Sequence, residues 1–340
     1  MPAVAVARAT TLAMWLLLSS AIILSNKELV GAHKFVHPMT LSAMGMAATA
    51  ALAYTCKLAV YALARAAPKR EMKGKPAPEA NSVTSMLVVP LGFVSALTLY
   101  TGNAAYLYLS VGFVQMLKAF TPVLTMFLLW ICELENITPR LAVATVVIAA
   151  GTAMAAKAEP RINLQGLAYM LTSMVGEAAK MVLTQSLLTK TNGSKSSSTP
   201  KTATGWSYQQ ANRYLDTLGS SSFVTSAFLG IGAHVYEADG LYRALPNLFL
   251  AKPMYTVVKS SLAFFVNLSQ LAALSLCGSL VLKVAGCVKS ALLVYLGWLL
   301  FNEEVSAQGI FGYGVSLVGF YFFTQAKQSA AVPPKAAKVS

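Results

Sequence analysis

Long apolar stretches separated by short polar segments dominate the pattern of this chain. Roughly 20 consecutive apolar residues cross the hydrocarbon core of a bilayer as a helix. We therefore predict an all-α membrane protein with ten transmembrane helices. The predicted spans are residues 11–30, 38–64, 83–103, 106–131, 138–156, 163–188, 215–235, 256–276, 279–301 and 306–326. The connections at 102–105 and 277–279 are so short that their flanking helices must be antiparallel neighbours.

The composition excludes several other classes of protein. Of the 340 residues, 56% are hydrophobic and 11% are charged, whereas about 25% of the residues in soluble proteins are charged. A soluble globule of this size needs more charge to cover its surface, which excludes soluble enzymes, disordered chains and secreted disulfide scaffolds. The cysteines predict neither a disulfide framework nor a metal site, because all four fall inside apolar stretches. They are Cys56, Cys132, Cys277 and Cys287.

The polar segments predict the orientation of the chain. One arginine, Arg8, precedes the first apolar run, and no small-residue cleavage site follows it, which favours a retained helix over a signal peptide. Two connections are long and polar, 65–82 and 189–214, and we expect the second to be mobile because it is rich in Ser, Thr, Gly and Lys. With a cytosolic N-terminus, the cytosolic segments hold 14 Lys and Arg against 5 on the opposite side. The positive-inside rule therefore predicts that both termini are cytosolic.

The two halves of the chain resemble each other weakly. At an offset of 168 residues, Trp130 aligns with Trp298 and Gly151 with Gly319. Five helices per half would turn the second copy upside down, which is the inverted repeat that many transporters use to build a site near the membrane midplane. The predicted units are residues 1–158, residues 159–327 and a cytosolic tail, 328–340.

Charged residues that remain inside the predicted spans indicate where the chemistry lies. They are Lys27, Lys57, Lys118, Lys180, Lys259, Lys283, Lys289, Glu28 and Glu177. A lysine at the centre of a spanning helix costs roughly 2.5–3.5 kcal/mol. Lys27, Lys57 and Lys259 stand nearer the ends of spans, where we expect the ammonium to reach the interface. Lys118 and Lys289 stand about ten residues into their spans, too deep for that.

Helical spacing adds polar neighbours to the deep lysines. Gln115 lies one turn before Lys118, and Glu177 lies one turn before Lys180 on the sixth span. A cavity with more lysine than carboxylate attracts a polyanion, and the ammonium suits phosphate. Two other interpretations stay open: the lysines pair with backbone carbonyls and stabilise packing, or Glu177 and Lys180 neutralise each other. Lys283, one turn into its span, either guards the cytosolic mouth or reaches the interface.

Four stretches resemble the triose-phosphate and nucleotide-sugar translocators of the drug/metabolite transporter superfamily. The first is Ser25-Asn-Lys-Glu-Leu-Val30, with the following Phe35-Val-His-Pro-Met-Thr40. The second runs from Tyr106 to Pro122 and is similar to the family's V-S-x-x-F-x-Q-x-L-K-A-x-x-P signature. The third, Lys283-Val-Ala-Gly-Cys-Val-Lys289, is similar to R/K-V-A-G-x-x-K. The fourth joins Gly312-Tyr313 with Gly319 and Lys327.

The resemblance implies ten helices, an inverted repeat and exchange of phosphate-bearing metabolites. It matches Lys118 and Lys289 with lysines that bind substrate phosphate, and Asn267 with an asparagine that often lines the site. In plastid phosphate exchangers an arginine follows the second lysine, where this chain has Ser290, which makes triose phosphate a less expected substrate. The complete candidate site comprises Lys118, Lys289, Lys180, Lys283, Gln115, Asn267, Ser290 and Asn26.

The leading hypothesis is an antiporter, not an enzyme, that exchanges a nucleotide sugar or sugar phosphate for a nucleoside monophosphate or phosphate. We expect it in the Golgi or ER membrane, because no transit peptide precedes the first helix. The alternatives are a plastid-envelope translocator of phosphoenolpyruvate, triose phosphate and phosphate, or an exporter of another anionic metabolite. We predict no cofactor and no bound metal. The net charge of +14 does not indicate a nucleic-acid partner, because its lysines and arginines lie in loops and spans.

Two other classes fit the sequence less well. A membrane enzyme would use His33 and His37, which have metal-ligand spacing, but Pro38 follows at once and the segment is a short loop without acids. A seven-helix receptor needs termini on opposite faces, which the distribution of Lys and Arg opposes. A phosphate-binding G-x-x-x-x-G-K-[ST] loop, which ATP-driven pumping would require, is missing from the sequence.

Overall fold

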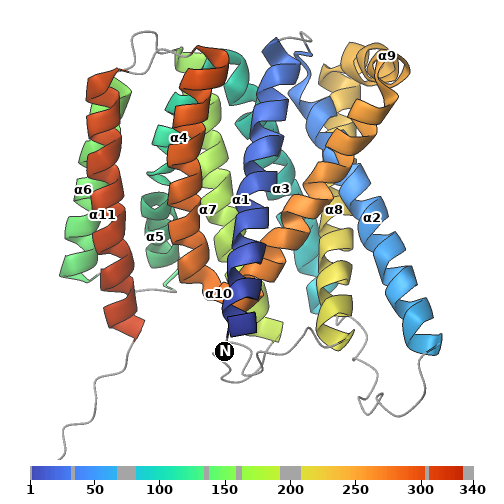
Figure 1. The fold of residues 1–340 in the computed structure, drawn as a ribbon, viewed down its shortest axis with the longest axis horizontal. Helices are drawn as coiled ribbons and strands as arrows, with labels where there is room; N and C mark the ends of the chain where they lie inside the picture. The colour runs from blue at the N-terminus through green and yellow to red at the C-terminus, as the bar shows by residue number, and fades with distance from the viewer. Residues whose placement is uncertain are drawn as a thin grey trace, which may run out of the picture.

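Every regular element in the structure, a computed structural model, is a helix (Figure 1). The structure describes residues 2–31, 35–66, 82–133, 138–157, 163–191, 208–302 and 306–331. The long helices are α1 (Pro2–Gly31), α2 (Pro38–Ala66), α3 (Ser82–Tyr108), α6 (Pro139–Lys157), α7 (Leu164–Thr191), α8 (Tyr208–Tyr236), α10 (Pro253–Phe301) and α11 (Ala307–Ala331). The shorter elements are α4 (Val111–Lys118), α5 (Thr121–Ile131), the π-helical segment η1 (Gly240–Ala244) and α9 (Leu245–Ala251).

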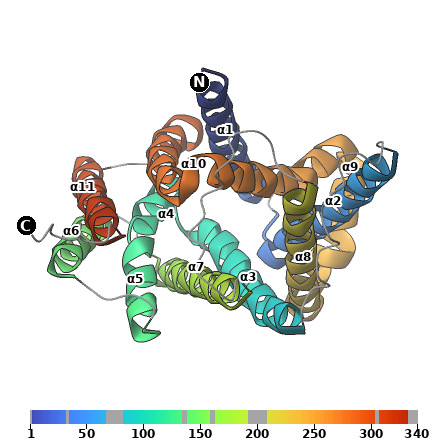
Figure 2. The same ribbon diagram turned by 90° about the horizontal axis from the view of Figure 1, so that it is seen from below.

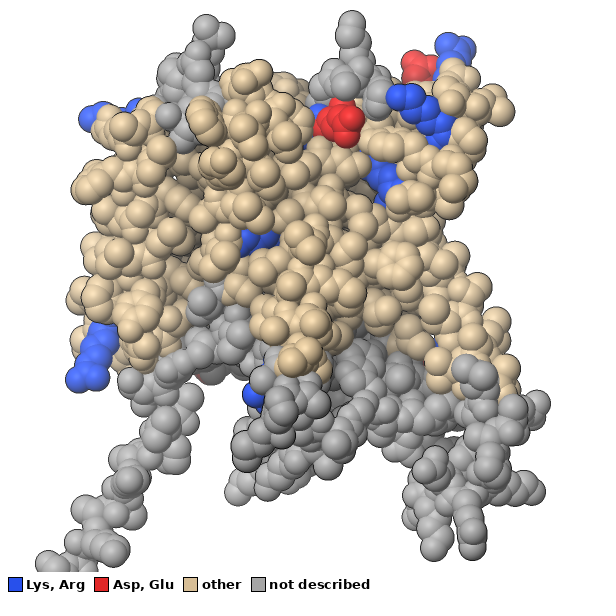
Figure 3. Space-filling model, in the orientation of Figure 1, with Lys and Arg blue, Asp and Glu red and all other residues tan. Residues whose placement is uncertain are grey.

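The outer surface of the bundle is apolar. Among the described residues, five segments are long and apolar enough to cross a bilayer: Val6–Leu29, Pro38–Ala62, Val88–Tyr108, Val111–Ile131 and Pro139–Lys157. Their outward side chains include Leu17 and Val146, which are 67% and 66% exposed. Figure 3 shows a largely uncharged face with most of its Lys and Arg toward the two ends. Such a belt is stable in lipid, so the chain is an integral membrane protein.

The predicted fourth span, 106–131, is divided differently in the structure. Helix α3 continues through the expected 102–105 connection to Tyr108, and α4 begins after Ser110, whose side chain accepts a hydrogen bond from the Phe113 amide at 3.1 Å. Helix α4 then ends at Lys118, and α5 starts three residues later with Pro122 in its first turn. A serine cap and a proline that lacks an N–H donor account for both breaks.

Helix α10 occupies both the eighth and the ninth predicted spans. This helix is continuous from Pro253 to Phe301 and passes through the expected connection at 277–279. It cannot be straight, because Lys259 and Lys289 are 30 residues, or about 45 Å, apart along a straight helix. They contact Ser25 and Trp15, only ten residues, or about 15 Å, apart on α1. Figures 1 and 2 show two arms that run in opposite directions, here called the first arm (253–276) and the second arm (279–301).

Two regions expected to be loops contain helix. Helix α8 begins at Tyr208, inside the polar segment 189–214, of which residues 192–207 lie outside the described part of the chain. Between α8 and α10, η1 and α9 form a short helical unit at one end of the bundle (Figure 1). Apolar residues of α9 give it a surface to bury: Leu248 packs on the cluster of Leu29, Phe35 and Leu41. The 16-residue connection between α8 and α10 therefore folds against the bundle.

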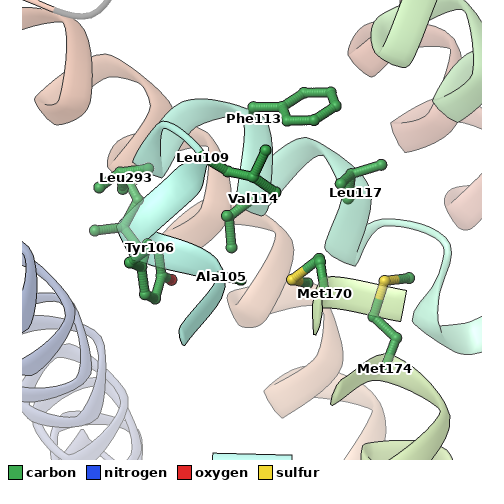
Figure 4. Close-up of a cluster of buried hydrophobic side chains, with 10 residues drawn as sticks. Ala105, Tyr106, Leu109, Phe113, Val114, Leu117, Met170, Met174 and Leu293 are labelled. Carbon is green, nitrogen blue, oxygen red and sulfur yellow. The ribbon is translucent and has the colours of Figure 1, made fainter. Parts of the chain in front are cut away.

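The helices pack in pairs around a central group. The most extensive contacts join α6 with α11, α2 with α8, α3 with α7 and α1 with α10. Figure 2 shows α6 and α11 at one end of the bundle and α2 and α8 at the other, with α3, α4, α7 and α10 between them. The main buried cluster holds α4 against α3, α7 and the second arm (Figure 4). Its members are Ala105, Tyr106, Leu109, Val111, Phe113, Val114, Leu117, Met170, Met174 and Leu293.

Glu237, just after α8, caps the start of α2. Its carboxylate accepts hydrogen bonds from the Met39 and Thr40 amides at 3.0 and 2.9 Å and from the Thr40 hydroxyl at 3.0 Å. These amides have no acceptor within their own helix. We expect Glu237→Ala to destabilise the protein by about 1–3 kcal/mol, measured as a lower midpoint of thermal unfolding in detergent. Asp239→Ala is the control, because Asp239 is 81% exposed and its ion pair with Arg243 lies at the surface; equal effects of the two substitutions would contradict the cap.

Candidate functional site

The interrupted fourth span places Gln115 and Lys118 inside the bundle. The Ser110 cap starts α4, and the main buried cluster fixes it against α3, α7 and the second arm. Gln115 is 1% exposed, whereas Lys118 is half-buried at the last residue of α4. The carbonyl end of a helix favours a cation, so the local backbone stabilises the Lys118 ammonium.

Gln115 joins three helices through its side-chain amide. Its Nε2 donates to the hydroxyl of Tyr106 on α3 at 3.0 Å, and its Oε1 accepts from the hydroxyl of Ser290 on the second arm at 3.2 Å. Tyr106 is itself buried. The chain Ser290–Gln115–Tyr106 therefore satisfies a fully buried amide and fixes the second arm relative to α4. Gln115 and Ser290, both expected in the site, are brought together directly.

Three lysines and one glutamate form the charged part of the candidate site, here called the lysine cluster (Lys118, Lys180, Lys289 and Glu177); Lys118 and Lys289 are half-buried, whereas Lys180 and Glu177 are exposed. Lys289 lies close enough to both Lys118 and Glu177 for electrostatic interaction, and Glu177 interacts in the same way with Lys118 and Lys180. Glu177 thus interacts electrostatically with all three ammonium groups, but in the described part of the chain no carboxylate oxygen lies at ion-pair distance from Lys118 or Lys289. The cluster joins α4, α7 and the second arm.

The ammonium groups of Lys118 and Lys289 have no carboxylate partner in the described part of the chain. No carboxylate oxygen there lies within 4.0 Å of either one. The Nζ atom of Lys289 instead lies 5.1 Å from the ring centroid of Trp15, a buried residue of α1. Half-buried cations without an acid at contact distance leave their donor groups available, which is the electrostatic condition for binding an anion.

The other expected site residues lie apart from these contacts. Asn26 donates from Nδ2 to Oδ1 of Asn103 at 3.1 Å, and Asn103 donates in turn to the hydroxyl of Ser42 at 2.7 Å. Asn267 donates to the carbonyl of Ala263 in its own helix at 2.8 Å. These bonds join Asn26 to α3 and α2 and leave Asn267 beside its own backbone. The side chain of Lys283 is outside the described residues.

Each of the three lysines nearer the span ends has a hydrogen-bond or ion-pair partner within the protein. Lys259 is 5% exposed and donates to the carbonyl of Ser25 at 3.1 Å. Lys27 donates to the carbonyls of Tyr106 and Leu109 at 3.1 Å each, where α3 ends. The unsatisfied carbonyls at that helix end attract the cation inward. For Lys259 the expectation was wrong, because its ammonium is buried against a backbone carbonyl. Lys57 forms an ion pair with Asp216 of α8.

Two aromatic residues of the site were missed in the sequence. Tyr106 accepts the hydrogen bond of Gln115 and lies close to Lys118. Trp15 lies against Lys289 from the opposite half of the chain. Tyr106 begins the second of the quoted stretches, so its position gave a usable signal. Trp15 gave little, because it stands within an apolar run and its partner is 274 residues away in sequence.

A helical bundle with an apolar outer surface and several lysines among its helices defines a class, the integral membrane proteins. The sequence itself gives a narrower assignment. The model of the Triose-phosphate Transporter family matches residues 6–324, and the chain belongs to this family.

Plant proteins are among its relatives. A probable sugar phosphate/phosphate translocator of Arabidopsis thaliana is 27% identical over 336 residues, which cover 97% of this chain and 87% of the relative. A second protein of that description is 27% identical over 94% of this chain and 83% of its own length. UDP-galactose transporter 1 of the same plant is 26% identical over 69% of this chain and 65% of its own length. The relatives thus include proteins named for sugar phosphates and for a nucleotide sugar.

Proposed function

We propose that this protein is an antiporter that exchanges a nucleotide sugar or sugar phosphate for a nucleoside monophosphate or phosphate across an organelle membrane. The observation that carries the proposal is the pair of half-buried ammonium groups, Lys118 and Lys289, which have no carboxylate at contact distance among the described residues. Phosphate supplies the missing negative charge and several acceptor oxygens. The relatives named for sugar phosphates and for a nucleotide sugar support such a substrate.

The proposed architecture is ten spans arranged as two inverted five-helix repeats. Shifting α2, α3 and α6 by 168 residues brings their first residues to within three residues of those of α8, α10 and α11. The packing is consistent with this correspondence, because α2 packs on α8 and α6 packs on α11. Likewise α3 packs on α7, and α10, the counterpart of α3, packs on α1. An inverted repeat of this kind supports alternating access, in which one half rocks against the other around the site.

The unpaired charges also favour exchange over one-way transport. An empty carrier that closes around Lys118 and Lys289 must move two cations into a low-dielectric enclosure in which Glu177 is the one acidic neighbour among the described residues. A bound phosphate group removes much of that cost. Each passage of the carrier is therefore expected to require an anionic substrate, so import of one species is coupled to export of another. We further propose that both termini are cytosolic and that the protein lies in the Golgi or ER membrane.

The hydroxyl of Ser290 favours a larger substrate than triose phosphate. This hydroxyl donates a hydrogen bond to Gln115 and, unlike an arginine, adds no fixed charge beside Lys289. A small phosphate ester would gain most from a second cation at this position, whereas a nucleotide sugar offers two linked phosphates and further polar groups for recognition. We therefore rank the nucleotide sugar first.

A ligand panel tests the proposal on the detergent-purified protein. A ligand at about 100 times its Kd should stabilise the protein by about 2.7 kcal/mol, seen as a rise of several degrees in the midpoint of thermal unfolding. The panel contains UMP, GMP, CMP and AMP, the nucleotide sugars with the same bases, phosphoenolpyruvate, triose phosphate and inorganic phosphate. A response to one nucleoside monophosphate and its matching sugar supports the proposal. A response to small phosphates alone assigns the protein to the plastid-type alternative, and no response to any anion overturns the cationic site.

A further inference from the structure

The Lys289 ammonium lies over the face of an uncharged aromatic ring. Its Nζ atom is 5.1 Å from the centroid of Trp15, and within the described residues this ring is the one partner at contact distance. Trp15 is 6% exposed, so the indole has little contact with lipid. Tryptophan in membrane proteins is enriched at the interfaces, where its N–H reaches water. A buried tryptophan in the middle of α1 therefore needs another explanation.

The ring is seated against the second arm one turn before Lys289. A Cβ atom built on Gly286 would lie 3.9 Å from Cη2 of Trp15, an ordinary packing distance. Gly286 and Lys289 are three residues apart and share one face of the helix. The indole thus covers the backbone beside the lysine and offers its π face to the ammonium. Because Trp15 is in the first half of the chain and Lys289 in the second, the contact joins both halves at the site.

We propose that Trp15 is a positioning residue that holds the Lys289 ammonium ready for a substrate phosphate without neutralising it. The proposal rests on the proposed function, since it concerns the same site. A free lysine side chain has many rotamers, and a partner that selects one of them reduces the entropy lost on binding. A carboxylate would also select a rotamer, but it would cancel the charge that attracts the substrate. The indole attracts the cation through its quadrupole and carries no charge, so the ammonium keeps N–H groups for phosphate oxygens.

Binding of a phosphate probe to Trp15 variants tests this role. The probes are UMP and inorganic phosphate, and affinity is measured by titration calorimetry and by thermal shift. We expect Trp15→Leu to weaken binding about 2- to 30-fold, which is the range of a cation–π contact converted at tenfold per 1.4 kcal/mol. Trp15→Phe keeps a weaker π face and should lose less. Trp298→Leu is the matched control. Trp298 lies on the second arm, as Lys289 does, but it is 54% exposed, so its substitution should leave affinity unchanged.

A double-mutant cycle separates positioning from a general packing role. In a Lys289→Gln background, Trp15→Leu or Trp15→Phe should cause no further loss of affinity, because the ring has no ammonium to hold. The same loss in both backgrounds, or unchanged binding by both Trp15 variants, would overturn the inference. Should Trp15→Leu fail to fold, the cycle is completed with Trp15→Phe. Failure of the proposed function looks different, since Lys118→Gln and Lys289→Gln would then bind both probes as tightly as the unsubstituted protein.

Discussion

Replacing Lys118 or Lys289 with glutamine is expected to abolish exchange in reconstituted vesicles and to remove most of the stabilisation by anionic ligands. Each ammonium is half-buried and lacks a carboxylate within 4.0 Å in the described chain, so a bound phosphate is its main available counter-charge. A hydrogen bond between charged groups contributes about 1.5–3 kcal/mol. Each substitution should therefore weaken the binding of a phosphate-bearing ligand by roughly 10- to 100-fold, at about 1.4 kcal/mol per tenfold. Thermal shift against ligand concentration and radiolabelled counterflow measure the two effects.

Lys57→Gln is the matched control for these substitutions. Lys57 also lies within a predicted span, but its ammonium is paired with Asp216 and its side chain is 40% exposed. Ligand-induced stabilisation and exchange should both persist in this variant. The pair itself is partly exposed, so its loss should change stability by no more than about 1 kcal/mol.

The stability of the ligand-free variants distinguishes a binding role from a structural one. Confining the Lys118 and Lys289 ammonium groups near each other without an acid in contact is unfavourable. Their replacement by neutral glutamine should therefore leave the empty protein as stable as before, or more stable. If both lysines served to stabilise helix packing, each substitution would lower the unfolding midpoint of the empty protein, and normal ligand responses would remain. That combination would remove both residues from the site.

The helices themselves were predictable because a membrane span is specified by the length of an apolar run. Helices α2, α6 and α11 begin within one residue of the predicted starts at 38, 138 and 306. The helix ends near 102–110 could not be predicted, because Leu109 and Ser110 lie within a stretch of mixed apolar and polar residues. The cap at Ser110 is visible only from its contact with the Phe113 amide. The helical content of 240–251 was missed for a related reason: its burial depends on a cluster formed by residues far away in sequence.

The candidate site likewise contains some residues that the sequence predicted and others that it could not. Helical spacing placed Gln115 beside Lys118, and the family resemblance placed Ser290 beside Lys289; the structure brings these two pairs together. Spacing could not show that Lys259 turns inward, because the direction of a long side chain is decided by the carbonyl of Ser25 on another helix. Nor could it select Trp15 from the other large apolar residues of its span. What sequence reasoning lacks in each case is a tertiary partner.

Substituting Gly312 is expected to separate α6 from α11 and strongly destabilise the protein. A Cβ atom on Gly312 would lie 2.5 Å from the amide nitrogen of Ala155 and 2.8 Å from the carbonyl oxygen of Gly151. Both atoms belong to backbone, which cannot move aside as a flexible side chain can. Small residues allow such close approach between membrane helices, where packing replaces the hydrophobic effect as the driving force. We expect Gly312→Val to cost at least about 1–3 kcal/mol, seen as a lower unfolding midpoint and a reduced yield of monodisperse protein.

The same interface shows why the effect should extend beyond one clash. The hydroxyls of Thr152 and Ser316 lie 3.1 Å apart, and Ser316 donates across the interface to the carbonyl of Ile148 at 3.3 Å. Moving the helices apart to admit a side chain at Gly312 would break these bonds in an apolar environment. Gly314→Val is the matched control, because a Cβ there meets nothing within 4 Å. An equal loss of stability in both variants would mean that glycine matters for the conformation of α11 itself, and that the close approach to α6 contributes little.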